Sequence, residues 1–557
     1  MTPKQLFDLG TTLFDKKSSL NSLHQEIATH FYPERATFTV TRSLGEDFAG
    51  NLYTSYPLLC RRDLGNQFSS MLRPTAKQWF HMQRRYEKSE KNEVRRYLEA
   101  FEETQRRALY DPISQFTRAT KEGDHDFSAF GQCALSVEVN HNSKLGSHLL
   151  FRCWHLKDMA WQEDESGKVE TKFRKWKPTI HAMRRVFKRI PQQLESRHTM
   201  APFEEHEIWH VVVPAEMYDK GTKLPYWGIW YDPSHDFVLD ESPLWTGHYV
   251  IPRWQTVSGS QYAYSPATVA ALPDARLIQA MTFALLEASE KATRPPMIAT
   301  QDAVRSDLAL YAGGVTWIDS EYDERLGDAL RPITQDYRGL QYGPQMNSDV
   351  RAMIREAFYL NKLAMPQRGP EMTAYEVGQR VQEYIRNAMP IFEPMEAEYN
   401  AALCENAFEL LWRNGAFGDP RNWPKELLGA EIEFRFESPL HDAIEEQKGH
   451  KLMEVKAMLA DAAAIAPEAI SLIDFKVALR EAMEGIQIPA TWIRSEDEVK
   501  KLMAAQEQAA AAQQMLGSME QASKINQNLA AAQAQGAPQG APPQAAPQTP
   551  ADMMAAA

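Results

Sequence analysis

The spacing of the hydrophobic residues changes along this chain, and the change restricts the fold to a mixture of helix and sheet. Between residues 3 and 31 apolar residues recur three or four positions apart, which is the spacing of an amphipathic helix. The same spacing returns over about 56–72 and about 89–110. From Cys133 to Val139 apolar residues instead alternate with small or polar ones, as in a strand with one buried face. We therefore predict helices first and a sheet after them.

The strand pattern extends well beyond Val139. Residues 149–155 and 169–176 are the next predicted strands, with Gly167 in the turn between them, and a basic amphipathic helix is predicted over about 179–189. From 205 to 255 aromatic and β-branched residues are separated by Gly, Pro and Asp. This composition predicts a compact β insertion between helical parts of the chain.

A long helix is predicted to start at Ser265-Pro266, because serine is a good N-cap and proline suits the first helical position. We expect Pro273 to kink or restart this helix, which should continue to about Lys291. Further along, Thr373-Ala374-Tyr375-Glu376 has the form of a capping box and predicts another helix start.

The C-terminal part is predicted to be mainly helical. Residues 431–436 alternate as a strand, and helices are expected over about 441–485. The Ala- and Gln-rich residues 495–534 should also be helical, either as a coiled-coil barrel in an oligomer or as a flexible tail. Residues 536–557 carry too little apolar bulk to fold.

The bulk properties narrow the possible partners. A net charge of −13 argues against a protein that grips DNA, because such proteins gain affinity by neutralising phosphates with Lys and Arg. A chain of this charge that handles DNA should let the duplex slide. The four cysteines form no C-x-x-C pair and predict buried thiols in a protein made in a reducing cytoplasm. No uncharged apolar stretch of about 18 residues occurs, so we predict no membrane span.

The usual catalytic signatures are missing from the sequence. It contains no G-x-x-x-x-G-K-[ST] phosphate loop, no G-x-G-x-x-G and no G-x-S-x-G. His206-Glu207-Ile208-Trp209-His210 does fit the zinc motif H-E-x-x-H, but that motif needs a helix and this context predicts a strand. Residues four apart on a strand lie about 13 Å from each other, too far for both imidazoles to share one ion. We therefore expect no enzyme, no catalytic residue, no metal and no cofactor.

Two other polar groups have both a functional and a structural interpretation. Asp124-His125-Asp126 fits a metal site or an acid–base pair, but a loop N-cap before Phe127 explains it as well, and we favour the N-cap. The basic run at 184–189 fits contact with phosphates or an acidic partner, but we favour a solvated helix face. The apolar residues expected to be buried behind that face are Met183, Val186, Phe187 and Ile190.

Five blocks of this sequence resemble the head-to-tail connector family of podovirus-type phages, and they occur in the family's order. The blocks are Asp63–Phe80, which ends in RPTAKQWF, YAYSPATVAALPDARLIQA at 262–280, ATRPPMIA at 292–299 followed by Gly313-Gly314, EMTAYEVGQRVQEY at 371–384, and EFRFESPL at 433–440. One departure is Ala263, which stands where the family usually has glycine. The resemblance covers about residues 1–500, and the block at 371–384 is the most specific.

The resemblance implies a mixed α+β portal fold, with long stem helices, a β-rich wing and clip insertion, and a helical crown with an Ala/Gln-rich C-terminal helix. Portal subunits of this family form dodecameric rings. Laid on this chain, the family's regions are a wing at 1–204, a clip at 205–262, a stem helix at 263–295, the rest of the wing with the channel loop and the following helix at 296–400, a crown at 401–494, and the Ala/Gln-rich helix with a disordered Pro/Gln tail at 495–557.

The resemblance also implies a function and candidate residues. The ring would occupy one capsid vertex, pass double-stranded DNA during packaging and ejection without sequence specificity, and carry the packaging motor and the tail. Its partners would be other copies of itself, the terminase large subunit, a tail adaptor or head-completion protein, and the major capsid and scaffold proteins, with no membrane involved. The channel candidates are Lys362, Gln367 and Arg368, and the candidates for docking partners at the clip are Tyr226, Trp227, Trp230 and Tyr231.

Three other functions compete with the portal interpretation. An internal core or scaffold protein of the virion would fit the Ala/Gln-rich end, and a closed ring would exclude it. A metalloenzyme built on His206 and His210 would bind zinc and lose it on His210→Ala. A standalone DNA-binding protein is disfavoured by the negative charge.

Overall fold

The computed structural model describes most of the N-terminal half of the chain and selected parts of the rest. The described residues are 1–293 apart from 44, 48, 51, 76, 86–91, 141–148 and 219, then 297–299, 330–332, 342–362, 386–387 and 394–436, and beyond these 479, 492, 498–509, 513, 515, 519 and 523–525. The chain divides into two compact units, Met1–Glu90 with Val94–Ile488, and Lys91–Glu93 with Pro489–Ala557. In the second unit residues 498–509 are helical and exposed, which confirms the predicted helix for those positions.

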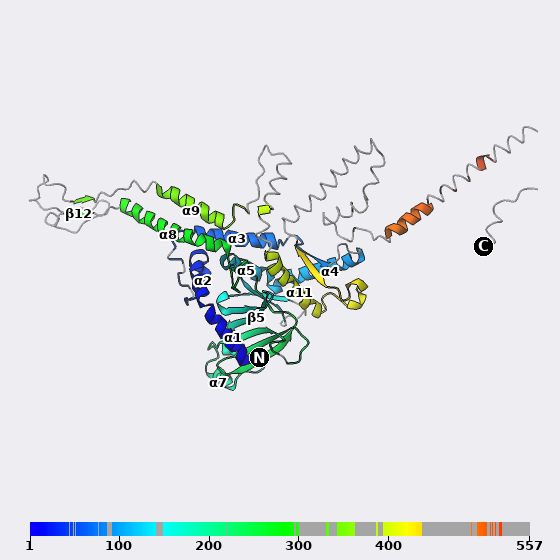
Figure 1. The fold of residues 1–557 in the computed structure, drawn as a ribbon, viewed down its shortest axis with the longest axis horizontal. Helices are drawn as coiled ribbons and strands as arrows, with labels where there is room; N and C mark the ends of the chain where they lie inside the picture. The colour runs from blue at the N-terminus through cyan, green and yellow to red at the C-terminus, as the bar shows by residue number, and fades with distance from the viewer. Residues whose placement is uncertain are drawn as a thin grey trace, which may run out of the picture. The chain divides into compact units, whose positions relative to one another are not determined.

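The first unit combines helices with several antiparallel sheets, as predicted (Figure 1). Its helices are α1 (Pro3–Lys16), α2 (Ser18–Phe31), α3 (Tyr56–Leu72), α4 (Asn92–Tyr110, of which the second unit takes the first two residues), α5 (Phe116–Phe130), α6 (Ile180–Val186), α7 (Gln192–Met200), α8 (Pro266–Thr293), α9 (Gly343–Ala357), and α11 (Ala402–Arg413), which follows a π-helical segment at Glu396–Ala401. The predicted helices over 3–31, 56–72 and 89–110 are confirmed, the first of them as two helices that meet at Lys17.

One sheet of five antiparallel strands follows the chain order β4-β5-β6-β7-β8. A second sheet has the order β3-β2-β9, and three further pairs are β1-β14, β10-β11 and β12-β13. The strands are β1 (Phe80–Arg84), β2 (Ala134–Val139), β3 (Leu149–Trp154), β4 (Met159–Glu163), β5 (Val169–Trp176), β6 (Ile208–Pro214), β7 (Tyr226–Asp232), β8 (Phe237–Leu244), β9 (Tyr249–Val250), β10 (Gln255–Thr256), β11 (Ala263–Tyr264), β12 (Met297–Ala299), β13 (Leu330–Pro332) and β14 (Ile432–Phe436).

The five-stranded sheet contains strands from both sides of the boundary that we expected between the wing (1–204) and the clip (205–262). β5 pairs with β6 in the register Phe173↔Val211, so strands from both sides of that boundary share one hydrogen-bonded ladder. β9, from the same 205–255 segment, pairs with β2 in the other sheet. The segment is therefore not a separate β insertion, because its backbone hydrogen bonds run to strands outside it. Its assignment to a clip remains a prediction.

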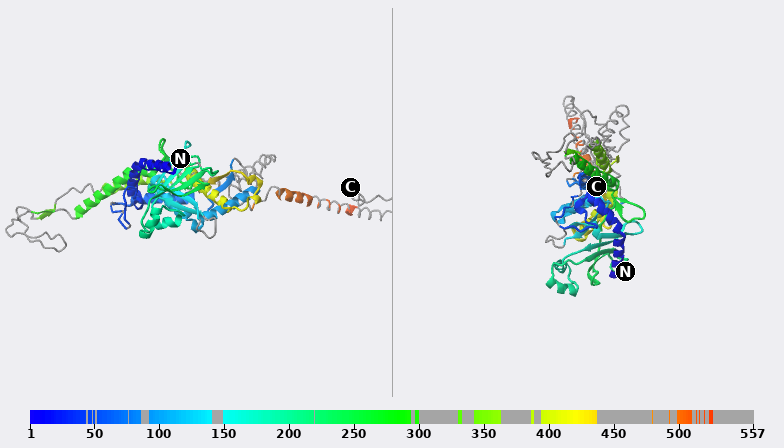
Figure 2. Two further views of the ribbon diagram at one scale, coloured as in Figure 1. Left: turned by 90° about the horizontal axis from the view of Figure 1, so that it is seen from below. Right: turned by 90° about the vertical axis from the view of Figure 1, so that its left-hand side faces the viewer.

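Helix α1 covers one face of the five-stranded sheet (Figure 2, right). Leu6 and Leu13 are buried in one cluster with Phe173, Trp209 and other sheet residues, and the Phe7 and Trp209 rings meet edge to face at 4.7 Å. α6 and α7 pack on a different part of the sheet through Met183, Leu194 and their neighbours. Apolar residues therefore point to both sides of the sheet, and a strict polar–apolar alternation is absent from β6.

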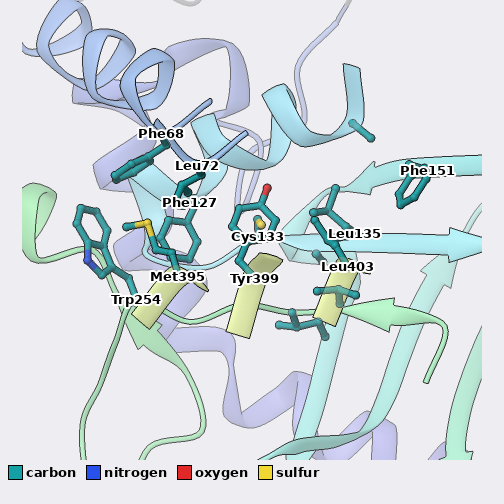
Figure 3. Close-up of a cluster of buried hydrophobic side chains, with 14 of the residues drawn as sticks. Phe68, Leu72, Phe127, Cys133, Leu135, Phe151, Trp254, Met395, Tyr399 and Leu403 are labelled. Atoms are coloured by element: carbon teal, nitrogen blue, oxygen red, sulfur yellow. The ribbon is translucent and has the colours of Figure 1, made fainter. Parts of the chain in front are cut away.

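The main core joins segments that are far apart in the sequence (Figure 3). Phe68 and Leu72 of α3 lie beside Phe127 of α5, and Trp254 stacks on the Phe127 ring with centroids 5.6 Å apart. Residues from the π-helical segment and α11 close the same cluster from the C-terminal side. This core fixes residues 395–411 against the N-terminal helices and the β3-β2-β9 sheet.

Helix α8 starts as predicted, with the Ser265 hydroxyl accepting from the Thr268 amide at 3.4 Å. It runs without a break through Pro273, so the expected restart does not occur. α9 lies alongside it, and the pair leads away from the two sheets (Figures 1 and 2). By length and composition alone α8 also suffices to cross a membrane, which the sequence did not indicate because Asp274 and Arg276 interrupt its apolar run.

The turn after α5 leaves no room for a side chain at Gly131. This residue has φ +71°, and a Cβ atom there would lie 2.1 Å from the Tyr264 carbonyl carbon. We expect Gly131→Ala to lower the free energy of unfolding by about 3 kcal/mol, since a left-handed backbone and a backbone clash add together. Gly167→Ala is the control, because Gly167 has φ +78° but open space around it, and it should cost about 1 kcal/mol. Urea unfolding of both variants checks this, and equal costs would contradict the clash.

Lys17, between α1 and α2, is buried with its ammonium group on the carbonyl oxygens of Leu156 and Met159, at 2.5 and 2.8 Å. Burial lowers the pKa of Lys17 from 10.5 to about 7, partly opposed by Asp158. Between these two values the unfolded chain holds a proton that the folded chain has lost, so stability should rise with pH over this window.

Replacing Lys17 by methionine should flatten the rise in stability between pH 7 and 10.5, by up to about 5 kcal/mol across the window. The exposed neighbour Lys16→Met is the matched control and should leave the pH profile unchanged. Unfolding midpoints in urea at a series of pH values measure both. A profile for Lys17→Met that keeps the wild-type slope would show that another group, such as Lys172, causes it.

Candidate functional site

One of the three channel candidates falls within the described residues. Lys362 is exposed a few residues after α9, and its ammonium group lies 5.7 Å from the centre of the Tyr359 ring. Tyr359 has φ +57°, so the chain turns sharply as it leaves α9. Gln367, Arg368 and the capping box at Thr373 lie outside the described residues. So do the predicted helices over 441–485, apart from Leu479, which is helical. The channel role of all three candidates remains a prediction.

The four aromatic residues proposed for docking belong to β7 and point alternately to its two sides. Trp227 and Tyr231 are buried, Trp227 among the residues that pack under α1. Trp230 is half-buried and stacks on the His210 ring, with centroids 4.2 Å apart, while Tyr226 is half-buried 5.6 Å from the Lys172 ammonium group. Within one subunit these rings mainly pack against other side chains on the two faces of the sheet. Their docking role remains a prediction, with Tyr226 and Trp230 the more accessible.

The second half of α8 is an apolar surface that the described subunit does not bury. All buried residues of α8 lie between Ala267 and Gln279, and none lies between Ala280 and Thr293. We call the exposed apolar side chains of α8 and α9 the α8–α9 surface. Its members are Val269, Leu277, Phe283 and Leu286 of α8, Tyr342, which precedes α9, and Met346 and Met353 of α9.

Polar contacts fix the first half of α8 to the rest of the subunit. The Gln279 side-chain oxygen accepts from the amides of Tyr53 and Thr54, at 2.8 and 3.1 Å, and its nitrogen donates to the Thr54 carbonyl at 2.8 Å. Arg276 forms an ion pair with Glu26 of α2. The helix is thus anchored at one end and leaves its apolar second half exposed.

Asp124-His125-Asp126 lies inside α5, so the predicted N-cap in a loop is wrong. The three side chains diverge on the helix: Asp124 pairs with Arg73, His125 contacts Arg61 at 3.1 Å, and Asp126 accepts two hydrogen bonds from Arg35, at 3.0 and 2.7 Å. Each acid is therefore neutralised by its own arginine. The group neither gathers around a common point for a metal nor forms an acid–base pair.

The Arg73–Asp124 pair is the most deeply buried ion pair among the described residues. Arg73 also donates to the Asn400 side-chain oxygen at 2.7 Å, and its guanidinium lies over the Tyr399 ring at 4.4 Å. Burial alone would lower the pKa of Arg73, but the adjacent Asp124 carboxylate raises that pKa above its usual range. Burial also raises the pKa of Asp124, opposed by the Arg73 guanidinium. The pair connects the end of α3 with α5 and the π-helical segment.

The basic run at 184–189 forms an exposed face of α6 and the residues after it, as expected. Met183 and Phe187 are buried behind it and Ile190 is partly buried, but Val186 is exposed, contrary to the prediction. The short helix ends at Val186, so the helical spacing on which that prediction relied stops there.

His210 stands on strand β6, as the sequence predicted, whereas His206 precedes that strand, and the two imidazoles do not face a common ion. His210 is buried in β6 and lies 2.5 Å from the Tyr249 hydroxyl oxygen, and burial lowers its pKa well below the usual range. His206 precedes β6 and contacts Asp232 instead, at 2.9 Å. The H-E-x-x-H match thus has no zinc-enzyme geometry, although His206 has acidic and imidazole neighbours of its own.

An exposed apolar helix on an otherwise well-packed subunit is typical of a protein that assembles with further chains. Comparison with known proteins identifies the class. The family model described as bacteriophage head to tail connecting protein matches residues 4–493, and the chain belongs to that family, the portal proteins of phages.

Two relatives are named as portal proteins. The chain is 24% identical over 484 residues to a probable portal protein of Bordetella phage BPP-1, covering 85% of each protein. It is also 24% identical over 364 residues to the portal protein of Salmonella phage epsilon15, covering 63% of this chain and 64% of that protein. Among solved structures, a chain from the neck of an empty GTA particle matches with a TM-score of 0.33 and 11% identity, over 72% of this chain and 89% of that one.

Proposed function

We propose that copies of this chain form a closed ring, of about twelve subunits as in its family, at one vertex of the capsid. The ring would be the channel for double-stranded DNA during packaging and ejection and the platform for the packaging motor and the tail. The observation that carries this proposal is the α8–α9 surface. Each apolar side chain of that size contributes about 1.5–3 kcal/mol when it is buried, so several of them exposed together need a covering partner.

A neighbouring copy is the partner that suits this surface best. In a closed ring every subunit contacts two others through the same pair of surfaces, so a single apolar helix can satisfy all copies. A lipid bilayer would also cover apolar side chains. However, Gln279 and Arg276 lie near the middle of α8 and bond to Thr54 and Glu26 of the same subunit, which a lipid-exposed span would not allow. We therefore assign α8 to the ring rather than to a membrane.

We assign the remaining roles by analogy with the regions of the family. The stem would be residues 263–295 and the clip residues 205–262. The wing would be residues 1–204 with 296–400, and the crown residues 401–494. The clip would meet the terminase large subunit and later a tail adaptor, and the wing the capsid and scaffold proteins. The chain would act as a structural component without enzymatic activity, made in the host cytoplasm and placed at the portal vertex of the virion.

Charge supports passage of DNA without binding. A subunit with a net charge of −13, repeated around a ring, gives a wall that repels phosphates overall. Lys362, Gln367 and Arg368 would be the local contacts with the duplex. A lumen lined mainly with Lys and Arg would contradict this part of the proposal.

The first test is the mass and shape of the purified full chain, by analytical ultracentrifugation and negative-stain microscopy. A ring of about twelve copies with an open channel is expected. A compact dimer or tetramer without a hole would overturn the proposal and favour an internal core or scaffold protein. If the chain is monomeric in isolation, co-expression with its capsid and scaffold proteins followed by imaging of the particle vertex decides the matter.

A further inference from the structure

Three polar side chains meet at one edge of the five-stranded sheet. His206 precedes β6, Asp232 is the last residue of β7, and His235 lies in the turn between β7 and β8. Because β6 and β7 are antiparallel, with Trp209 opposite Tyr231, the start of β6 and the end of β7 fall at the same edge. Residues far apart in the sequence are thus brought together by the strand register.

The distances between these side chains are those of a shared site. The His206 Nε2 atom lies 2.9 Å from one Asp232 oxygen, and the His235 Nδ1 atom lies 2.7 Å from the other. One candidate ligand atom from each residue lies within 4.8 Å of both others. An ion with tetrahedral bonds of 2.0–2.1 Å holds its donors about 3.3 Å apart, so these separations bracket the value that zinc needs.

Burial and charge favour a cation at this point. The Asp232 side chain is fully buried, whereas those of His206 and His235 are 14% and 21% exposed. Among the ion pairs of the described residues, the two histidines are the only basic partners of Asp232, and a buried carboxylate is costly without a positive partner. With neutral imidazoles the cluster carries one negative charge facing a partly open rim.

His206 adds an independent sign of a missing ligand. Its Nε2 atom is buried and makes no hydrogen bond of good geometry, although it lies 2.9 Å from an Asp232 oxygen. The Asp232 oxygen on that side accepts from the Ser234 amide at 2.9 Å instead. A buried ring nitrogen left without a partner costs free energy, and a bound metal ion would satisfy it.

We propose that His206, Asp232 and His235 bind one divalent transition-metal ion of the zinc class. Two imidazole nitrogens with one carboxylate oxygen suit zinc rather than magnesium or calcium, which prefer oxygen ligands. The fourth position faces the half-exposed rim and takes a water molecule. The ion joins the segment before β6, the end of β7 and the β7–β8 turn, so its role is to stabilise this edge of the sheet. The proposal stands whether or not the chain forms a ring.

Zinc binding by the full chain tests the proposal. The purified protein is treated with a chelator, dialysed, and titrated with Zn²⁺ by calorimetry, and retained metal is counted by mass spectrometry. About one zinc per subunit is expected, with a melting temperature that rises with zinc concentration. Titration with Co²⁺ adds a second readout, because a site of two nitrogens and an oxygen gives cobalt a visible absorption spectrum.

His206→Gln and His235→Gln should each weaken zinc binding by more than about 100-fold and remove the zinc-dependent rise in melting temperature. The matched control is His198→Gln, because His198 and His181 form an exposed imidazole pair 3.4 Å apart that offers adventitious binding outside the cluster. It should bind zinc like the wild-type chain. Melting temperatures in chelator show whether each variant still folds.

Two results would overturn the site. One is a wild-type chain that retains no stoichiometric zinc or cobalt, which would make the cluster a hydrogen-bonded His–Asp–His group only. The other is zinc that is lost in His198→Gln but kept in His206→Gln and His235→Gln, which would place the binding on the exposed imidazole pair.

Discussion

Replacement of Arg73 by alanine is expected to lower the free energy of unfolding by about 3–5 kcal/mol, the largest stability effect of any single change considered for this chain. The arginine is buried, pairs with Asp124, and donates to the Asn400 oxygen at 2.7 Å. Its removal leaves a carboxylate in the core with no counter-charge. Breaking a buried pair costs far more than the pair contributes, because the partner that remains has already lost its water.

A second variant separates the stranded charge from the lost packing. Removing both charges, in Arg73→Met with Asp124→Leu, should be less harmful than Arg73→Ala, since no unpaired charge remains. The surface control is Arg107→Ala, because Arg107 is exposed and bonds Glu103 one turn away on α4, and it should cost at most about 1 kcal/mol. Urea unfolding of all three measures the differences. If Arg107→Ala lowers the free energy of unfolding as much as Arg73→Ala, burial of the Arg73–Asp124 pair does not explain its effect on stability.

The sequence predicted best those elements whose local pattern and tertiary role agree. α3 begins at Tyr56 and ends at Leu72, as its apolar spacing predicted, and β14 falls on the alternating residues 431–436. The Ser265 cap was read correctly because capping depends on neighbouring residues alone. Within the described residues, agreement was therefore closest where helix or strand formation is decided within a few positions.

Errors arose where distant residues decide the outcome. Asp124-His125-Asp126 resembles a loop because Asp often caps helices, yet Arg73 and Arg35, far away in the sequence, make both acids tolerable inside α5. β4 was missed because Met159–Glu163 is short and forms a strand through its pairing with β5. The grouping of His206 with Asp232 and His235 depends on strand register, which periodicity does not specify.

The burial of the aromatic residues of β7 also depends on distant parts of the chain. The sequence YWGIWY predicts a strand but not which side of it faces solvent. α1 covers the side of the sheet that carries Trp227 and Tyr231, so both residues are buried. α6 and α7 pack on another part of the sheet, so neither side is left wholly free. The covering helices all precede β7 in the sequence, and only the assembled fold reveals which part of the sheet each of them covers.

Assembly should be most sensitive to a charge placed on the second half of α8. Leu286 is 59% exposed in the subunit, so Leu286→Asp should fold normally as a single chain. In a ring the same position is covered by a neighbour. An unpaired aspartate there loses the free energy gained by burying leucine and adds the cost of removing a carboxylate from water. Together these cost about 3 kcal/mol or more per interface, which weakens each contact roughly a hundredfold.

Val186→Asp supplies the matched control, because Val186 is 58% exposed on α6, outside the α8–α9 surface. Both changes add one negative charge at an equally exposed apolar position. We expect Val186→Asp to sediment as the wild-type ring and Leu286→Asp to remain mainly monomeric, with the same circular dichroism spectrum and melting transition for the two subunits. Rings of normal size from Leu286→Asp would show that α8 does not form the subunit contact. Loss of rings in both variants would mean that added charge alone prevents assembly, so only a difference between the two assigns the interface to α8.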